Sequence, residues 1–130
     1  MASDLSLVEL LSHILQEVLV YDRIPAAAKL ALIARELLMN AVVHGNRNDP
    51  RKQVSLSLER LDEGQFRLRV KDEGRGFDYS RLDTRLPQRL NERRRRGYAI
   101  VAKLADRIEF NGNGSEVVVM AGPDNGNIPA

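Results

Sequence analysis

Apolar residues recur every three or four positions in the first part of the chain, which is the period of an amphipathic helix. One such run covers residues 5–20 and follows Ser3 and Asp4, which are good helix N-caps. Its apolar positions are Leu7, Leu10, Leu11, Ile14, Leu15 and Val18. A second run lies between Pro25, which suits a first helical turn, and Gly45, which suits a helix end. Its apolar positions are Leu30, Ile33, Leu37, Leu38 and Ala41.

The pattern then changes to an alternation of apolar and polar residues, as in half-buried strands. Residues 54–59 and 66–71 alternate in this way, and Asp62-Glu63-Gly64 joins them, so the pattern predicts an antiparallel hairpin. Further along, the pattern predicts a short helix at 98–104 and two more strands at 108–111 and 116–120, about a turn at 112–114.

This order of elements predicts an α+β fold, a two-layer sandwich with helices on one face of a largely antiparallel, mixed sheet. The polar residues at alternate strand positions indicate that the face of the sheet away from the helices is exposed to water or contacts a partner. We expect one domain over residues 1–121 and a frayed tail over 122–130, which is rich in Gly, Pro and Asn. The polar segment 78–96 is too long for a compact connection and is typical of a lid.

The amino-acid composition excludes several classes of protein. The chain has 130 residues, of which 43% are hydrophobic and 29% charged, so disordered and fibrous proteins are excluded. It has no cysteine, which excludes disulfide scaffolds and thiolate metal sites. It has no apolar run of membrane-spanning length, and Met1-Ala2-Ser3-Asp4 lacks the basic start of a signal peptide. These features predict a cytoplasmic protein.

The net charge of +2 hides an uneven distribution. Residues 81–96 contain seven arginines and two acids, or +5, so the rest of the chain carries about −3. Because the positive charge is confined to one segment, we do not expect a nucleic-acid-binding surface. The run Arg93–Arg96 is by default a solvated stretch, and a phosphate or partner contact is the alternative.

Glu36 and Asn40 are four residues apart and therefore lie on one face of the second predicted helix. A carboxylate beside an amide oxygen can orient a hydroxyl group and help to hold Mg²⁺, which keeps several water and phosphate ligands. The spacing alone favours a solvated polar edge of the helix.

Two glycine-containing segments are the other candidates. Asp72-x-Gly74-x-Gly76 follows a predicted strand, where a carboxylate can accept a hydrogen bond from an amino group such as that of adenine. Gly97 precedes a predicted helix, whose first N–H groups could receive phosphate. Each segment in isolation is more typical of a turn, and the chain has no P-loop sequence.

In combination, however, these segments resemble a known family. The chain contains Glu36-Leu37-Leu38-Met39-Asn40-Ala41-Val42-Val43-His44-Gly45, then Asp72-Glu73-Gly74-Arg75-Gly76, then Arg96-Gly97-Tyr98-Ala99-Ile100. This order resembles the nucleotide-binding domain shared by gyrases, heat-shock chaperones, histidine kinases and mismatch-repair ATPases, the Bergerat fold. Within it, the run from Leu30 to Met120 looks most like the anti-sigma-factor serine/threonine protein kinases.

The resemblance implies the cofactors ATP and Mg²⁺ and assigns roles by position. Glu36 would be the general base, Asn40 the magnesium ligand and Asp72 the residue that binds the adenine amino group. Gly74 and Gly76 would shape the pocket, and Gly97 would sit at the phosphates. The remaining nucleotide-binding positions that it implies are Arg96, Tyr98 and Ser115. His44 would support the site, whereas His13 on the first helix is taken as a plain helix histidine.

The implied function is that of an anti-sigma-type kinase, which phosphorylates a serine or threonine on an antagonist protein and sequesters a sigma factor or another regulator. Two alternatives stay open. One is a non-catalytic, nucleotide-dependent binding module, because Ala99 replaces the second glycine of the phosphate motif. The other is a histidine-kinase catalytic domain with a separate phospho-acceptor, although Glu36 stands where histidine kinases usually carry asparagine. A homodimer is also left open.

Overall fold

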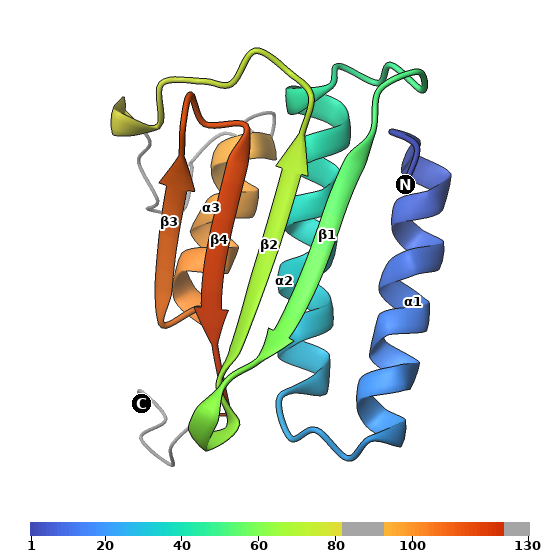
Figure 1. Ribbon diagram of the computed structural model, residues 1–130, viewed down its shortest axis with the longest axis vertical. Helices are drawn as coiled ribbons and strands as arrows, with labels where there is room; N and C mark the ends of the chain where they lie inside the picture. The colour runs from blue at the N-terminus through green and yellow to red at the C-terminus, as the bar shows by residue number, and fades with distance from the viewer. Residues whose placement is uncertain (82–92, 124–130) are drawn as a thin grey trace.

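The computed structural model describes residues 1–81 and 93–123. Its first helix stands beside a twisted sheet, and the other α-helices lie behind the sheet (Figure 1). The α-helices are α1 (Leu5–Tyr21), α2 (Ala27–Asn40) and α3 (Arg93–Leu104), and the strands are β1 (Val54–Arg60), β2 (Phe66–Asp72), β3 (Arg107–Asn111) and β4 (Glu116–Ala121). One π-helical turn, η1 (Ala41–Gly45), extends α2, and two short 3-10 turns are η2 (Asp62–Gly64) and η3 (Tyr79–Arg81). The two-layer α+β prediction is confirmed.

The four-stranded sheet has the order β1-β2-β4-β3. Every pairing among these strands is antiparallel, so the expectation of a mixed sheet is wrong for the described residues. The predicted hairpin is β1 and β2, with Val54 opposite Asp72. This register places Asp72 at the end of a central strand, since β4 pairs with β2 on its other side.

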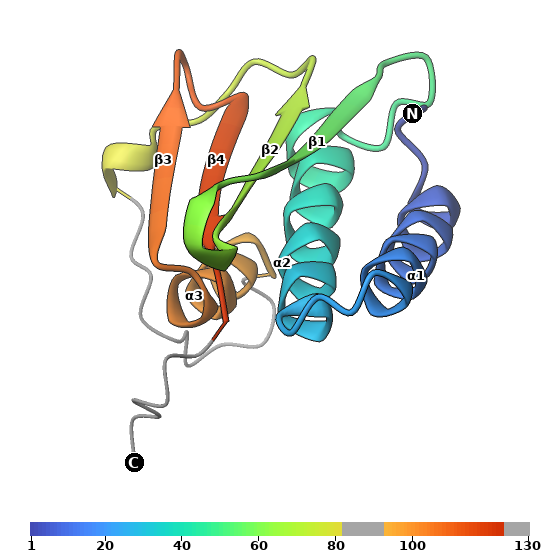
Figure 2. The ribbon, with the colours of Figure 1, turned by 60° about the horizontal axis from the view of Figure 1, so that its bottom comes forward.

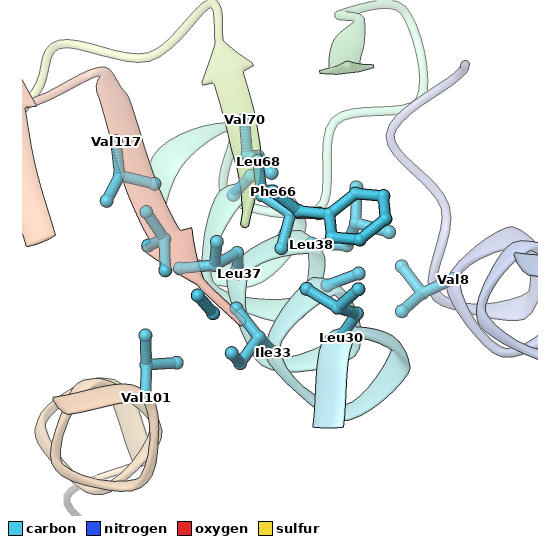
Figure 3. Packing of buried hydrophobic residues seen from close by; sticks show 14 of the residues in the cluster. Val8, Leu30, Ile33, Leu37, Leu38, Phe66, Leu68, Val70, Val101 and Val117 are labelled. Atoms are coloured by element: carbon cyan, nitrogen blue, oxygen red, sulfur yellow. The ribbon is translucent and has the colours of Figure 1, made fainter. Parts of the chain in front are cut away.

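The hydrophobic core lies between the helices and the sheet. The buried face of α2 supplies Leu30, Ile33, Leu37 and Leu38, as its helical period predicts. The inward positions of β2 supply Phe66, Leu68 and Val70, and Val101 of α3 and Val117 of β4 complete the layer (Figure 3). Helix α2 lies behind β1 and β2 (Figure 1), and Gly45, just beyond its end, meets Asp72 at the end of β2.

Helix α1 differs from the expected arrangement. Asp4 caps it as predicted: its Oδ1 accepts hydrogen bonds from the Ser6 hydroxyl at 2.8 Å and from the Ser6 N–H at 2.9 Å, and both lower the pKa of Asp4. However, Leu10, Ile14 and Val18, which were expected to face the core, are exposed, and the buried residues of α1 are Val8, Ser12 and Leu19. The reason is its place in the fold: α1 packs beside α2 beyond the edge strand β1, so the sheet does not cover it (Figures 1 and 2).

Helix α3 begins at Arg93, five residues before the predicted start. The arginines 93–96 therefore form its first turn, and Gly97 lies inside the helix. The expectation that Gly97 precedes a helix and offers free N–H groups to phosphate is wrong. Most of the lid-like segment, residues 82–92, lies outside the described residues, as does most of the predicted tail, 124–130. Gly122 at the start of that tail is buried, and its carbonyl accepts a 2.8 Å hydrogen bond from Lys29 Nζ.

The outer face of the sheet carries charged side chains, and positive and negative ones lie opposite each other on neighbouring strands. Ion pairs join Arg67 to Glu59 at 3.0 Å and Arg69 to Glu116 at 3.7 Å across neighbouring strands. Such a face is stable in water without a covering layer. None of the helices in the described part of the chain is long and apolar enough to cross a membrane.

Candidate functional site

The candidate site lies at the C-terminal end of α2. Glu36 and Asn40 occupy one face of its last turn and a half, as their spacing predicts. Beyond Asn40 the helix widens into the π-helical turn η1, in which the Asn46 N–H bonds to the Ala41 carbonyl at 2.8 Å. Turns of this type are frequent at functional sites. Here the turn carries the backbone from the Glu36–Asn40 face to Gly45, which touches Asp72.

Gly97 of α3 packs directly against Glu36 and Asn40. A Cβ atom at Gly97 would lie 3.0 Å from Asn40 Nδ2 and 3.1 Å from Glu36 Oε2, which is tighter than ordinary packing. The glycine therefore lets α3 approach α2 at the height of the two polar side chains. The structure thus brings Gly97 to Glu36 and Asn40, which lie far earlier in the sequence. Gly97 meets them through close approach and not as a helix N-terminus.

A cleft of about 280 Å³ opens at this point. Its lining residues are Arg35, Glu36, Met39, Asn40, Val43, His44 and Arg96. Two guanidinium groups, those of Arg35 and Arg96, thus line the same cleft as the Glu36 carboxylate. Arginine is well suited to contact phosphate oxygens. Arg96, which the sequence motif singled out, lines this cleft, whereas sequence reasoning did not single out Arg35.

Arg35 ties the cleft to helix α1. Its Nη2 lies 2.8 Å from Glu9 Oε1, and its Nη1 lies 3.6 Å from Glu36 Oε1. The hydrogen bond to Glu9 raises the pKa of Arg35 above its ordinary value, and the charge of Glu36 adds to the effect. One guanidinium group is therefore shared between a surface carboxylate and the candidate base.

Asn40 is the side chain whose surroundings point most directly to a ligand. It is 5% exposed, and its Nδ2 atom has no hydrogen-bond partner among the described residues. A buried N–H donor that lacks a partner costs free energy. Among the described residues, no three His, Cys, Asp or Glu side chains are grouped to hold a metal ion. The Asn40 amide oxygen is a type of ligand that Mg²⁺ accepts beside phosphate and water oxygens.

The other end of the site is built from Asp72 and two glycines in close contact. Asp72 is 9% exposed, and its Oδ1 accepts a 2.8 Å hydrogen bond from the Gly74 N–H. A Cβ at Gly45 would lie 2.3 Å from Asp72 Oδ2, and a Cβ at Gly74 would lie 2.0 Å from the Gly45 carbonyl oxygen. Neither position has room for a side chain. The carboxylate is therefore fixed at the strand exit by backbone packing.

Asn46 is a residue of this region that sequence reasoning missed. It is fully buried, its Oδ1 accepts a 2.8 Å hydrogen bond from the Glu73 N–H, and its Nδ2 donates to the Gln53 carbonyl at 2.9 Å. It thereby fastens the end of η1 to the loop after β2 and to the start of β1. A sequence signal was weak, because asparagine in a polar stretch is typical of any loop.

Gly76 and Ser115 also help to shape this end. Gly76 has φ +78°, and a Cβ there would lie 2.0 Å from the Asn113 carbonyl oxygen, so both its conformation and its contact require glycine. The Ser115 carbonyl accepts a 2.9 Å hydrogen bond from the Asp72 N–H, so Ser115 meets Asp72 through its backbone.

Tyr98 does not direct its ring into the cleft. It is 4% exposed and stacks on Phe77 with ring centroids 5.8 Å apart. Phe110 and Tyr79 complete the cluster, with their rings stacked at 5.1 Å. Any contact of Tyr98 with a nucleotide would therefore involve its backbone. Of the two histidines, His44 lines the cleft, and His13 pairs with Glu17 on the exposed side of α1, as a plain helix histidine would.

Comparisons with known proteins agree with this geometry. A family model for the histidine kinase-like ATPase domain matches residues 1–121. The chain therefore belongs to the histidine kinase-like ATPase domain family. Family membership makes it an ATP-binding domain and supports a phosphotransfer enzyme in general.

Two solved structures are similar to the chain. The histidine kinase domain of the Erythrobacter litoralis EL346 blue-light activated histidine kinase is 25% identical, with a TM-score of 0.50 over 74% of this chain and 43% of that one. A structure of that blue-light activated histidine kinase is also 25% identical, with a TM-score of 0.52 over 75% of this chain and 30% of that one. The chain thus spans less than half the length of either. Among curated proteins, none matches.

Proposed function

We propose that the chain is a regulatory protein kinase of the anti-sigma type, which binds MgATP and phosphorylates a serine or threonine on an antagonist protein. The observation that carries the proposal is the carboxylate of Glu36, which lines the cleft one turn before Asn40 and against Gly97. A serine hydroxyl is a weak nucleophile until its proton has an acceptor. Glu36 is the carboxylate in the cleft that can take that proton.

The other residues of the site have binding roles in this proposal. The Asn40 amide oxygen serves as a magnesium ligand, and Asp72 accepts a hydrogen bond from the adenine amino group. Arg35 and Arg96 attract and orient the phosphates. When bound, MgATP supplies the γ-phosphoryl group: a bond forms between the serine Oγ and the γ-phosphorus, the bond to the β–γ bridging oxygen breaks, and MgADP leaves. Glu36 takes the hydroxyl proton.

Regulation in this proposal comes from sequestering a partner, which is a sigma factor or another regulatory protein. The support is the resemblance of the motif set to anti-sigma kinases. A histidine-kinase catalytic domain is the second candidate, and the two similar solved structures, both from a histidine kinase, favour it. Ala99, which is fully buried where the motif has its second glycine, favours a third candidate, a non-catalytic binding module.

The test is a phosphotransfer assay with γ-labelled MgATP and a candidate antagonist, such as one encoded by a neighbouring gene. We expect acid-stable phosphoserine or phosphothreonine on the antagonist. Glu36→Gln should reduce transfer by about 10²–10⁴-fold, the usual contribution of a positioned base, while MgATP affinity changes little.

The assay also separates the other candidates. An acid-labile label on a histidine of a phospho-acceptor protein would replace the proposal with a histidine kinase. Nucleotide binding without transfer to either kind of acceptor would leave the binding module. Transfer by Glu36→Gln at the wild-type rate would remove Glu36 as the base.

A further inference from the structure

Arg35 is a charged residue of the candidate site that belongs to none of the sequence motifs. Its side chain lines two hollows of the surface. One is the cleft of about 280 Å³ that Glu36 and Asn40 also line. The other, of about 230 Å³, lies between α1 and α2, which stand side by side (Figure 2). A planar guanidinium group has donors on more than one edge, so it can serve two neighbouring hollows at once.

The two edges of the Arg35 guanidinium group have different surroundings. Nε and Nη2 donate hydrogen bonds to Glu9 Oε1 at 3.0 Å and 2.8 Å, which fixes this edge against α1. Nη1 lies 3.6 Å from Glu36 Oε1, which is too long for a hydrogen bond. The charge of Glu36 therefore attracts Nη1 without using its N–H groups. These donors can bond an anionic oxygen that enters the cleft.

The order of residues along α2 places Arg35 at one end of the site. Gly45, just beyond the helix, touches Asp72. Asn40 and then Glu36 follow toward the start of the helix, where each turn advances about 5.4 Å. A nucleotide with its adenine at Asp72 and its magnesium at Asn40 would direct its phosphate chain toward the start of α2. The terminal phosphate is then the group that reaches Glu36 and Arg35.

The proposed reaction leads to the same position. A general base must lie within hydrogen-bond reach of the attacking hydroxyl, and that hydroxyl must lie next to the phosphorus it attacks. A cation beside the Glu36 carboxylate is therefore beside the terminal phosphate. Asn40 supports an anion at this place, because its buried Nδ2 is a donor without a partner among the described residues, and a phosphate oxygen is an acceptor.

We propose that Arg35 binds the terminal phosphate and makes the site specific for a nucleoside triphosphate over the diphosphate. This inference rests on the proposed function, from which it takes the orientation of the nucleotide. Guanidinium groups suit the task, since they donate paired hydrogen bonds to phosphate oxygens. With MgADP, Arg35 has no terminal phosphoryl group to contact. The product is therefore held less tightly than MgATP, which favours its exchange after each transfer.

Arg35 is suited to this discrimination because its position is fixed. It stands on the same helix as Glu36 and Asn40, and groups carried by one rigid element keep their spacing. The two hydrogen bonds to Glu9 hold its other edge, so less side-chain entropy is lost when a phosphate binds. Arg96 lines the same cleft from a different helix, α3.

The test compares the affinities of a non-hydrolysable MgATP analogue and of MgADP, measured by titration calorimetry on the full chain without an acceptor protein. Wild type should prefer the analogue. Arg35→Gln should weaken the analogue by about tenfold or more, the worth of a charge-assisted hydrogen bond. It should weaken MgADP by less than about threefold, since only a screened long-range attraction is lost. Arg35→Lys keeps the charge without the planar fork and should lie between wild type and Arg35→Gln.

Two further variants separate the guanidinium group from its ion pair. Glu9→Gln removes the pair with α1 but keeps Arg35, so the preference for the analogue should change by less than about threefold. Arg67→Gln is the matched control, because Arg67 has a similar exposure, 33% against 37%, and pairs with Glu59 at 3.0 Å on the outer face of the sheet. It should keep the full wild-type preference.

The outcomes distinguish this inference from the proposed function. An unchanged preference in Arg35→Gln, an equal loss of both affinities, or a wild type without preference would each overturn the role of Arg35, while the proposed kinase would stand. A loss of preference in Arg67→Gln as large as in Arg35→Gln would also overturn it. A wild type that binds neither nucleotide would overturn the proposed function, and the role of Arg35 with it.

Discussion

The two ends of the candidate site are built in different ways. At the Asp72 end, the backbones of Gly45 and Gly74 and one carboxylate are in close contact. A Cβ at either glycine would lie 2.0–2.9 Å from its three nearest neighbouring atoms. At the Glu36 end, side chains surround a cleft of about 280 Å³, and one buried amide atom has no partner among the described residues.

This difference indicates how each end meets a ligand. Groups fixed by backbone packing are preorganised, so they select a shape and lose little entropy on binding. Polar side chains around an open cleft gain their missing interactions only when a ligand arrives, and until then they lower the stability of the protein. Substitutions should therefore reduce stability and binding together at the Asp72 end, and should separate the two at the Glu36 end.

The largest effect is expected for Gly74→Ala. A methyl group 2.0 Å from the Gly45 carbonyl oxygen must displace backbone, because no flexible side chain can yield. Overpacking of this kind typically costs about 1–3 kcal/mol and sometimes more, and the displacement also moves Asp72. Thermal melting and calorimetry with an ATP analogue should both show a loss.

The control for this prediction is Gly112→Ala. A Cβ atom at Gly112 would have no atom within 4 Å other than those of its chain neighbours, so this change adds a methyl group without a clash. It carries only the strain of a positive φ, about 1 kcal/mol. Equal melting temperatures for Gly74→Ala and wild type would contradict the tight packing of the Asp72 end.

The second prediction concerns the Glu36 end of the site, where the cleft opens. Asn40→Ala removes a buried side chain whose Nδ2 has no partner among the described residues, so the free energy of unfolding should change by less than about 1 kcal/mol. Magnesium-dependent ATP affinity should fall by up to about 3 kcal/mol, the worth of a polar contact with a charged group. Titrations with and without Mg²⁺ would measure the difference. A large loss of stability with unchanged affinity would show that Asn40 is structural.

The third prediction tests whether the Asp72 end of the site selects adenine nucleotides over guanine nucleotides. Asp72→Asn keeps the shape of the side chain but replaces one acceptor oxygen with a donor. ATP affinity should fall by about 1–3 kcal/mol, because a buried hydrogen bond is then mismatched. Wild type should bind GTP poorly, since guanine presents a carbonyl where adenine has its amino group. Equal calorimetric affinities of wild type for ATP and GTP would reject Asp72 as the adenine contact.

The same contrast explains what the sequence could and could not predict. Glu36, Asn40 and Asp72 stand in regular elements whose period was clear, so their positions on a helix face and at a strand exit followed directly. Asn46 lies in an irregular segment. Its partners, the Glu73 N–H and the Gln53 carbonyl, lie just after β2 and just before β1, and no local pattern identifies them. The early start of α3 was hidden because its first turn of arginines has no apolar period.

The sequence also could not predict that one apolar face of α1 is exposed. The period correctly predicted a helix over about 5–20, and the structure has Leu5–Tyr21. An apolar helix face is normally assigned to the core, and only the arrangement of layers shows that this helix lies past the edge of the sheet. The period fixes which residues share a face, whereas the tertiary contacts decide which face is buried.

The smallest effect is expected for Glu9→Gln. This substitution tests whether the ion pair with Glu9 holds Arg35 in position at the Glu36 end of the site. Glu9 is well exposed, with 63% of its side chain accessible, and exposed ion pairs contribute about 0.2–1 kcal/mol. Losing the pair frees Arg35 from α1 while its 3.6 Å contact with Glu36 remains. We expect a stability loss below about 1 kcal/mol and a change in phosphotransfer rate of less than about fivefold, both reduced by salt. Glu17→Gln, which breaks the exposed pair with His13 away from the cleft, is the matched control and should leave the rate unchanged. A rate loss of a hundredfold in Glu9→Gln alone would mean that α1 positions Arg35 for the reaction, and the open end would then be preorganised as well.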